Sequence, residues 1–215
     1  MERTKLFVIG DSISIGYGPY LEKYLGNGFN YSRKGDEGGD LSDISEELKG
    51  LNGGDSSVVS RYVEVLEKTG SFHRDVMLLN CGLHDVRVLP GSEERQVSLD
   101  AYQQNLRQIS GKVQSIAART VWVRTTPVVS AIHNAKKDIY RFEQDVLAYN
   151  EAADQIMRAA GIILADLYTF TANQGLDENS VTDGVHFTPE MQMKQASFLA
   201  GFIDALLPAD KHRTF

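Results

Sequence analysis

The sequence lacks the features that mark disulfide-bonded, exported and membrane-spanning chains. It contains 1 cysteine, Cys81, in 215 residues, so no disulfide can form within the chain. No apolar run approaches the length of a membrane span, and residues 1–5 lead into the first predicted strand without an apolar signal segment. A cytoplasmic location is therefore the default expectation, although removal of an export signal would leave the same sequence.

Positive charge is also scarce. The chain carries 22 Lys and Arg against 29 Asp and Glu, a net charge of -7, and its basic residues are scattered. Nucleic acids and anionic membranes bind clustered Lys and Arg, so we expect neither as the main partner. The composition is otherwise ordinary for a globular protein and predicts neither the substrate nor the oligomeric state.

Motifs for bound cofactors are missing as well. The glycines near Ser12 form neither a P-loop nor a Gly-x-Gly-x-x-Gly fingerprint. His73, His133 and His212 have no carboxylate or cysteine partner at metal-ligand spacing, and we expect them to be solvated. No metal and no cofactor are expected. Cys81 ends an apolar run and is expected to be an inert core thiol.

What the sequence does contain is an alternation of short apolar runs and longer amphipathic segments. Strands are predicted at 6–9, 29–32, 75–82, 119–125 and 161–167. Helices are predicted up to residue 25, from near residue 41, and over 56–69, 97–118, 138–160 and 188–207, with an irregular connection at 128–137. A length of 215 residues suits one domain, which we place at 1–215 with a tail from about 208.

This alternation predicts an α/β domain with a largely parallel sheet of about five strands and helices on both faces. The carboxyl ends of parallel strands meet at one edge of such a sheet. We therefore expect that edge to collect segments that are far apart in the chain. They are the Gly10-Asp11-Ser12 stretch, the loop around Gly38, residues 82–85, the Thr126-Pro127 pair and the loop at Asp183.

Ser12 is the candidate nucleophile at that edge, because it follows a buried strand at a glycine that lets the backbone turn. A serine hydroxyl needs a base within reach and a carboxylate that orients the base, and His186 and Asp183 suit these roles. On a tight loop, an Asp-x-x-His pair can fold the carboxylate back onto the imidazole. Taken singly, Gly-Asp-Ser is also ordinary turn and N-cap chemistry, and Asp-x-x-His pairs are more often structural.

Taken together and in order, these blocks resemble one family. Gly-Asp-Ser follows the first strand, Gly35-Asp36-Glu37-Gly38 the second and Gly82-Leu83-His84-Asp85 the third, while Asp183 and His186 precede the final helix. The set is similar to the SGNH, or GDSL-type, hydrolases over essentially the whole chain. The resemblance implies a flavodoxin-like three-layer α/β/α fold and ester hydrolysis through an acyl-serine intermediate. It makes Ser12 the nucleophile, His186 the general base and Asp183 its orienting acid.

The resemblance also implies an oxyanion hole, and here the sequence departs from the family's pattern. The family uses the nucleophile's own amide, a second-block glycine and an asparagine. Ser12 and Gly38 match the first two, but His84 stands in the place of the asparagine. His84 can donate a ring N–H to the oxyanion, lie on the surface as a loop residue, or mark a site that has lost catalysis. We expect the first, because the triad is complete, and we expect Asp85 to brace the loop.

The function implied by the resemblance is that of a serine esterase. Its expected substrate is a short acyl ester, acetyl above all, of a small molecule or carbohydrate, because the sequence shows no apolar lid or long hydrophobic insertion. Two alternatives stay open: a lysophospholipase or thioesterase that acts on longer chains, and a catalytically silent carbohydrate-binding protein. Aromatic residues that flank the site are expected mainly in the core: Tyr17, Tyr20, Tyr168, Phe170 and Phe187.

Overall fold

The computed structural model describes residues 2–36 and 44–207, which are built around a five-stranded parallel sheet. The strands are β1 (Thr4–Ile9), β2 (Phe29–Arg33), β3 (Arg74–Leu79), β4 (Ala117–Val123) and β5 (Ile163–Ala165). Their order, β2-β1-β3-β4-β5, is that of flavodoxin-like folds, in which ligands bind at the switch point between β1 and β3. The predicted fold class is confirmed.

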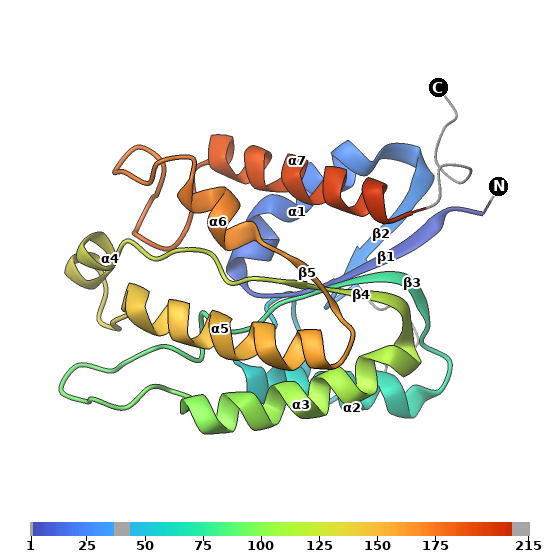
Figure 1. The fold of residues 1–215 in the computed structure, drawn as a ribbon, viewed down its shortest axis with the longest axis horizontal. Helices are drawn as coiled ribbons and strands as arrows, with labels where there is room; N and C mark the ends of the chain where they lie inside the picture. The colour runs from blue at the N-terminus through green and yellow to red at the C-terminus, as the bar shows by residue number, and fades with distance from the viewer. Residues whose placement is uncertain (1, 37–43, 208–215) are drawn as a thin grey trace.

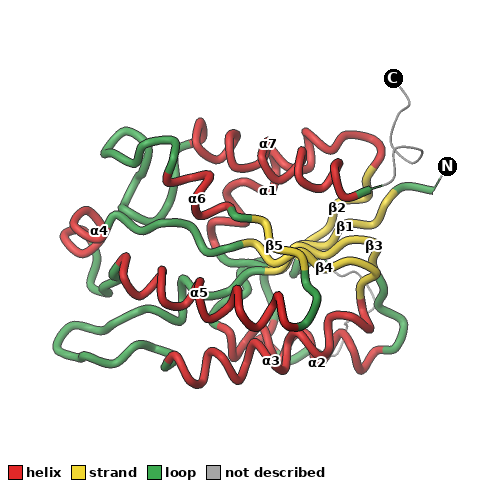
Figure 2. Tube along the Cα trace, in the orientation of Figure 1, coloured by secondary structure: helices red, strands yellow, loops and turns green. Residues whose placement is uncertain are grey.

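Helices cover both faces of the sheet (Figures 1 and 2). One face carries α1 (Ser12–Leu25), α6 (Leu167–Ala172) and α7 (Pro189–Leu206), and the other carries α2 (Ser56–Thr69), α3 (Leu99–Ile116) and α5 (Glu143–Ala159). Between these layers the apolar side chains of β1 are buried, as a strand covered on both faces requires. Within the described residues, no helix has the length and apolar character needed to cross a membrane.

The prediction fails over residues 128–142. The expected irregular connection contains a helix, α4 (Ser130–Lys136), and the helix expected from residue 138 begins only at Glu143. Residues 138–142 form a non-helical connection instead. The amide of Tyr140 donates to the Val88 carbonyl at 2.7 Å, and its carbonyl accepts the Val88 amide at 2.9 Å. α4 lies at the end of the sheet to which the strands point (Figure 1), so this segment belongs to the functional edge.

Other differences are smaller. β3 and β5 end at Leu79 and Ala165, earlier than predicted, because the chain turns there. α6 is absent from the prediction, although Asp166 caps it by accepting the Thr169 amide at 3.0 Å. The helix expected from near residue 41 is wrong over residues 44–51, where the chain forms only one short 3₁₀ turn, Glu46–Leu48. Residues 37–43 lie outside the described residues, as does the predicted tail from about 208.

Asp85 ties the turn after β3 to the start of α2. Its buried carboxylate accepts the Ser56 amide at 3.0 Å on both oxygens, and it also accepts the Ser56 hydroxyl. That hydroxyl accepts in turn from Asn105 Nδ2 on α3 at 2.9 Å. Burial raises the pKa of Asp85 to about 7, and the hydrogen bonds from Ser56 oppose the rise only in part. Asp85 therefore braces the loop, as expected.

The pH dependence of stability tests this buried carboxyl. In the unfolded chain an Asp ionises near its ordinary pKa of 3.8, whereas in the folded protein Asp85 stays protonated up to a pH of about 7. Between these two pH values, only the unfolded state loses this proton. The free energy of unfolding of the wild type should therefore fall relative to that of Asp85→Asn as the pH rises from about 4 to about 7. Denaturant titrations over this range measure the difference, and parallel curves for the two proteins would contradict the assignment.

Candidate active site

Ser12 is the first residue of α1, directly after the turn at Gly10. Asp11 caps the helix: its buried carboxylate accepts the Ile13 amide at 2.9 Å, and its carbonyl accepts the Ser14 hydroxyl at 2.7 Å. Gly10 leaves no room for a side chain, because a Cβ there would lie 2.9 Å from Ser14. The turn thus places Ser12 at the carboxyl edge of the sheet, with an amide that has no partner inside the helix.

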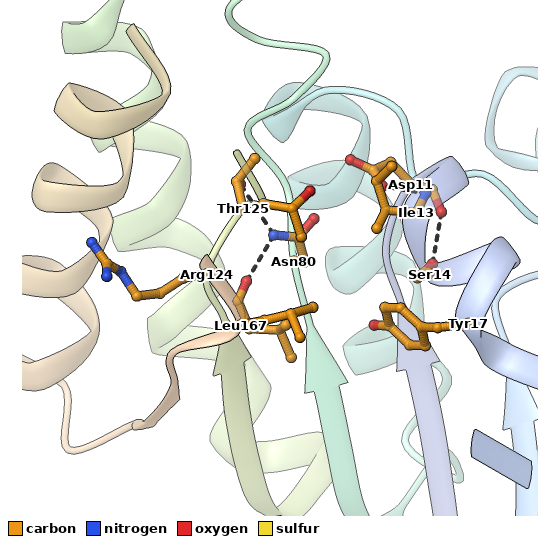
Figure 3. Close-up of a pocket in the computed structure, with 10 residues that line it drawn as sticks. Asp11, Ile13, Ser14, Tyr17, Asn80, Arg124, Thr125 and Leu167 are labelled. Atoms are coloured by element: carbon orange, nitrogen blue, oxygen red, sulfur yellow. Dashed lines mark hydrogen bonds between the residues drawn. The ribbon is translucent and has the colours of Figure 1, made fainter. Parts of the chain in front are cut away.

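A small pocket lies behind this turn (Figure 3). Asp11, Tyr17 and Leu167 are among its lining residues. Asn80 also lines it and links β3 to β4, because its Nδ2 donates to the Val123 carbonyl at 2.7 Å. The cavity volume of about 10 Å³ suits about one water molecule. The pocket is therefore part of the support for the turn and has no room for a substrate.

Asp183 and His186 approach Ser12 from a tight loop before α7. The Asp183 carboxylate accepts the His186 amide at 2.9 Å and His186 Nδ1–H at 2.9 and 3.1 Å. At the other ring nitrogen, the Ser12 hydroxyl donates to His186 Nε2 at 2.8 Å. Burial acts to raise the pKa of Asp183, but the hydrogen bonds from His186 and Lys137 outweigh it and hold this pKa well below its usual range. The side chains form one continuous chain of hydrogen bonds.

The loop that carries Asp183 is supported by α4. The Gly184 carbonyl accepts the Val129 amide at 2.8 Å, and the φ of Gly184 is +87°. A Cβ on Gly184 would lie only 2.5 Å from the amide nitrogen of His133. Lys137, which follows α4, pairs with Asp183 Oδ2 at 3.1 Å. The segment predicted to be irregular is thus the support of the candidate acid.

His133, on α4, is buried, so the prediction that it is solvated is wrong. His73 is exposed as predicted, and His212 lies outside the described residues. Arg141 Nη1–H donates to His133 Nε2 at 2.9 Å, which leaves the ring proton on Nδ1, at 3.2 Å from the Asp183 carbonyl. Arg141 Nε–H also donates to the Leu83 carbonyl at 2.7 Å. Sequence reasoning missed Arg141, because its segment carries the pattern of an exposed helix start.

His84 lies in the turn after β3. Arg87 Nη2–H donates to His84 Nε2 at 3.3 Å. Burial, with the charges of Arg87 and Arg141, lowers the pKa of His84 to about 3, so the ring is neutral at ordinary pH. The side chain is partly buried, so His84 is not a fully exposed surface residue. Gly38, the other predicted oxyanion residue, lies outside the described residues.

The remaining candidates are structural. Tyr17 and Phe187 are 2% and 3% exposed, as core residues, and the other flanking aromatic residues are partly buried against the core. Cys81 is buried, and burial raises the pKa of its thiol well above the usual range, as expected of an inert side chain. Over residues 2–36 and 44–207, no group of three His, Cys, Asp or Glu side chains is placed to hold a metal ion.

Comparison with known proteins identifies the family. A sequence profile of the GDSL-like lipase/acylhydrolase family matches residues 8–194, a span that contains Ser12, His84, Asp183 and His186. The chain belongs to this family. It is accordingly a carboxylic ester hydrolase by class, and the resemblance noted from the sequence blocks is confirmed. A comparison with curated protein sequences gives no match.

Solved esterase structures share the fold of this GDSL-like chain. A lipase/acylhydrolase from Enterococcus faecalis has a TM-score of 0.69 at 13% identity, with 100% of both chains covered. A carbohydrate acetylesterase from Sinorhizobium meliloti has a TM-score of 0.68 at 12% identity, with 96% of this chain and 100% of that chain covered. An acetylxylan esterase from Geobacillus stearothermophilus has a TM-score of 0.65 at 18% identity, with coverage of 99% and 97%. At these identities the likeness establishes the fold.

Gly184→Ala tests whether α4 positions the candidate acid. Its left-handed backbone and its contact with His133 leave no space for a methyl group, so the loop must move away from α4. Gly175→Ala is the matched control, because its φ is +78° but its added Cβ would meet nothing within 4 Å. We expect Gly175→Ala to lose about 1 kcal/mol of stability and Gly184→Ala to lose more, and Gly184→Ala alone to lose kcat, by roughly a hundredfold. Equal kcat values for the two variants, measured on one ester, would contradict the role of α4.

Proposed function

We propose that the protein is a serine esterase in which Ser12 is the nucleophile, His186 the general base and Asp183 the acid that orients the base. The observation that carries this proposal is the hydrogen-bonded chain from Ser12 Oγ through His186 to Asp183, at 2.8 and 2.9 Å. In a member of an acylhydrolase family, these contacts have the order and the lengths that acyl transfer to serine requires.

In the proposed reaction, Ser12 Oγ attacks the ester carbonyl carbon while His186 Nε2 takes the hydroxyl proton. The imidazolium then gives this proton to the leaving alcohol, and the acyl group stays on Ser12. His186 then deprotonates a water molecule, which attacks the acyl-serine. The imidazolium returns this proton to Ser12 Oγ as the bond between Oγ and the acyl carbon breaks, so the carboxylic acid leaves and Ser12 is restored. Because its pKa is held low, Asp183 stays ionised and stabilises the imidazolium in both half-reactions.

The carbonyl oxygen gains negative charge in both half-reactions and needs donors aimed at it. The Ser12 amide is available at the start of α1, and we assign the His84 ring N–H and the Gly38 amide as the further donors. A neutral imidazole N–H can replace the amide of the family's asparagine in this role. On this proposal, His84 takes over the catalytic role of the family's asparagine.

Two substitutions at His84 test this assignment. His84→Asn restores an amide donor and should retain most of the activity, whereas His84→Ala should lose on the order of a hundredfold in kcat, the usual effect of one missing oxyanion donor. Steady-state kinetics on one acetyl ester compare the two. If both variants hydrolyse it at the same rate, His84 donates nothing to the oxyanion.

As substrate we propose a short acyl ester of a polar molecule, with an acetylated carbohydrate as the leading candidate. His84 and Arg87, both partly buried, present polar and charged groups on the turn after β3, at the same edge of the sheet as Ser12, which suits a polar alcohol. The pocket behind the nucleophile turn has a volume of only about 10 Å³ and cannot take a long acyl chain. The similar structures described as a carbohydrate acetylesterase and an acetylxylan esterase support the same class.

A longer acyl chain is the second candidate, and one feature of the surface favours it. A pocket of about 330 Å³ adjoins Arg87 and is lined in part by the apolar side chains of Leu89 and Ile139. Leu89 is 64% exposed. An exposed apolar side chain at the mouth of a pocket is a place where an alkyl chain can bind.

Hydrolysis of p-nitrophenyl acetate, butyrate, octanoate and palmitate distinguishes these candidates. We expect kcat/KM to fall with chain length, and Ser12→Ala to lose on the order of 10⁴-fold or more in kcat. Ser115→Ala, which alters an exposed serine on α3, is the matched control and should keep full activity. A rise with chain length would favour the second candidate. If no ester is hydrolysed in a Ser12-dependent way, both esterase candidates fail, and the alternative of a catalytically silent binding protein is favoured.

A further inference from the structure

We propose that Arg87 is a positioning residue that holds His84 as its Nδ1–H tautomer and so makes that N–H available to the oxyanion. The inference rests on the proposed esterase function and adds to it the residue that selects the protonated ring nitrogen. A neutral imidazole carries only one N–H, and the hydrogen bond at the other nitrogen decides where that proton lies.

The contact between the two side chains determines the tautomer. A guanidinium only donates hydrogen bonds, so Arg87 Nη2–H at 3.3 Å requires a lone pair on His84 Nε2. Because the ring is neutral, its single proton then lies on Nδ1. Among the hydrogen bonds of the described residues, His84 Nδ1 takes part in none, so its N–H is free for a substrate oxygen.

The backbone fixes both partners of this contact. The Arg87 amide donates to the His84 carbonyl at 3.3 Å, which places the two residues on one side of the turn after β3. The Arg87 carbonyl accepts the Gln96 amide at 2.8 Å, and the following amide, that of Val88, donates to the Tyr140 carbonyl at 2.9 Å. The guanidinium is thus presented from an anchored segment rather than from a free loop.

Arg87 has no competing ion pair in the part of the chain that the structure describes. Asp11, Asp55 and Asp85 favour its charge from nearby, but none of them forms a salt bridge with it. The hydrogen bond to His84 is therefore its only described side-chain partner.

A second pair in the same structure shows the same chemistry. Arg141 donates to Nε2 of the buried His133 at 2.9 Å, and the proton left on His133 Nδ1 faces the carbonyl of Asp183 at 3.2 Å. At His133, the arginine that donates to Nε2 leaves the proton on Nδ1, which faces an oxygen acceptor. At His84, no residue of the described chain accepts from Nδ1–H, so a substrate oxygen can do so.

Nitrogen-15 NMR of histidine-labelled protein measures the tautomer directly, with His84→Asn used to assign the signal. We expect the correlation pattern of Nδ1–H for His84 in the wild type, and a mixed pattern of both tautomers in Arg87→Met. Arg87→Lys keeps a donor and should retain more of the Nδ1–H form than Arg87→Met. An Nε2–H pattern in the wild type would overturn the proposal, whether or not the protein hydrolyses esters.

Kinetics in two backgrounds separate positioning from general support of the fold. Arg87→Met should lower kcat roughly tenfold with little change in KM when His84 is present. In the His84→Asn background the same change should alter kcat less than about twofold, because an amide has no tautomers. Arg61→Met removes an exposed arginine and controls for the lost charge.

Equal losses of kcat from Arg87→Met in both backgrounds would overturn the proposal. If Ser12→Ala leaves turnover intact, the esterase function fails instead, and the NMR result still decides the tautomer.

Discussion

The hydrogen bond between Ser12 and His186 is the contact on which the rest of the site depends. It joins residues 174 positions apart, and it forms because a parallel sheet brings the end of β1 and the loop before α7 to the same edge. The surrounding structure supports its two ends. Asp11 caps α1 and fixes Ser12, while Asp183 and α4 fix the imidazole.

The sheet and the triad geometry could be predicted from the sequence, because each rests on local chemistry. A four-residue apolar run before Gly10 is a strand, and an Asp-x-x-His pair on a tight loop folds its carboxylate onto the ring. The segment around α4 could not be predicted in this way. α4 is too short to show helical periodicity and has no side-chain N-cap, so it is held by tertiary contacts such as that of His133 with Arg141. Residues 138–142 carry a helical pattern, but pairing with Val88 overrides it.

Two histidines near the candidate site, His84 and His133, each accept a hydrogen bond from an arginine, and the sequence motifs predict neither contact. Burial and the neighbouring guanidinium charges lower the pKa of His84 and of His133, so both rings stay neutral. Burial lowers the pKa of Arg141 to about 10, which leaves it charged at neutral pH. At each ring the arginine occupies one nitrogen, so the single N–H of the neutral imidazole lies on the other. The net charge of -7 therefore does not describe the immediate surroundings of His84 and His133, where guanidinium groups lie.

Covalent labelling with an alkyl fluorophosphonate tests the central claim most directly, because the reagent reacts with an activated serine and needs no knowledge of the substrate. If Ser12 is the activated nucleophile, we expect one adduct per chain, located on Ser12 by peptide mass spectrometry, and much slower labelling when His186 is replaced by Ala. An adduct on another residue would contradict the account. So would labelling of Ser12 that proceeds at the same rate without His186.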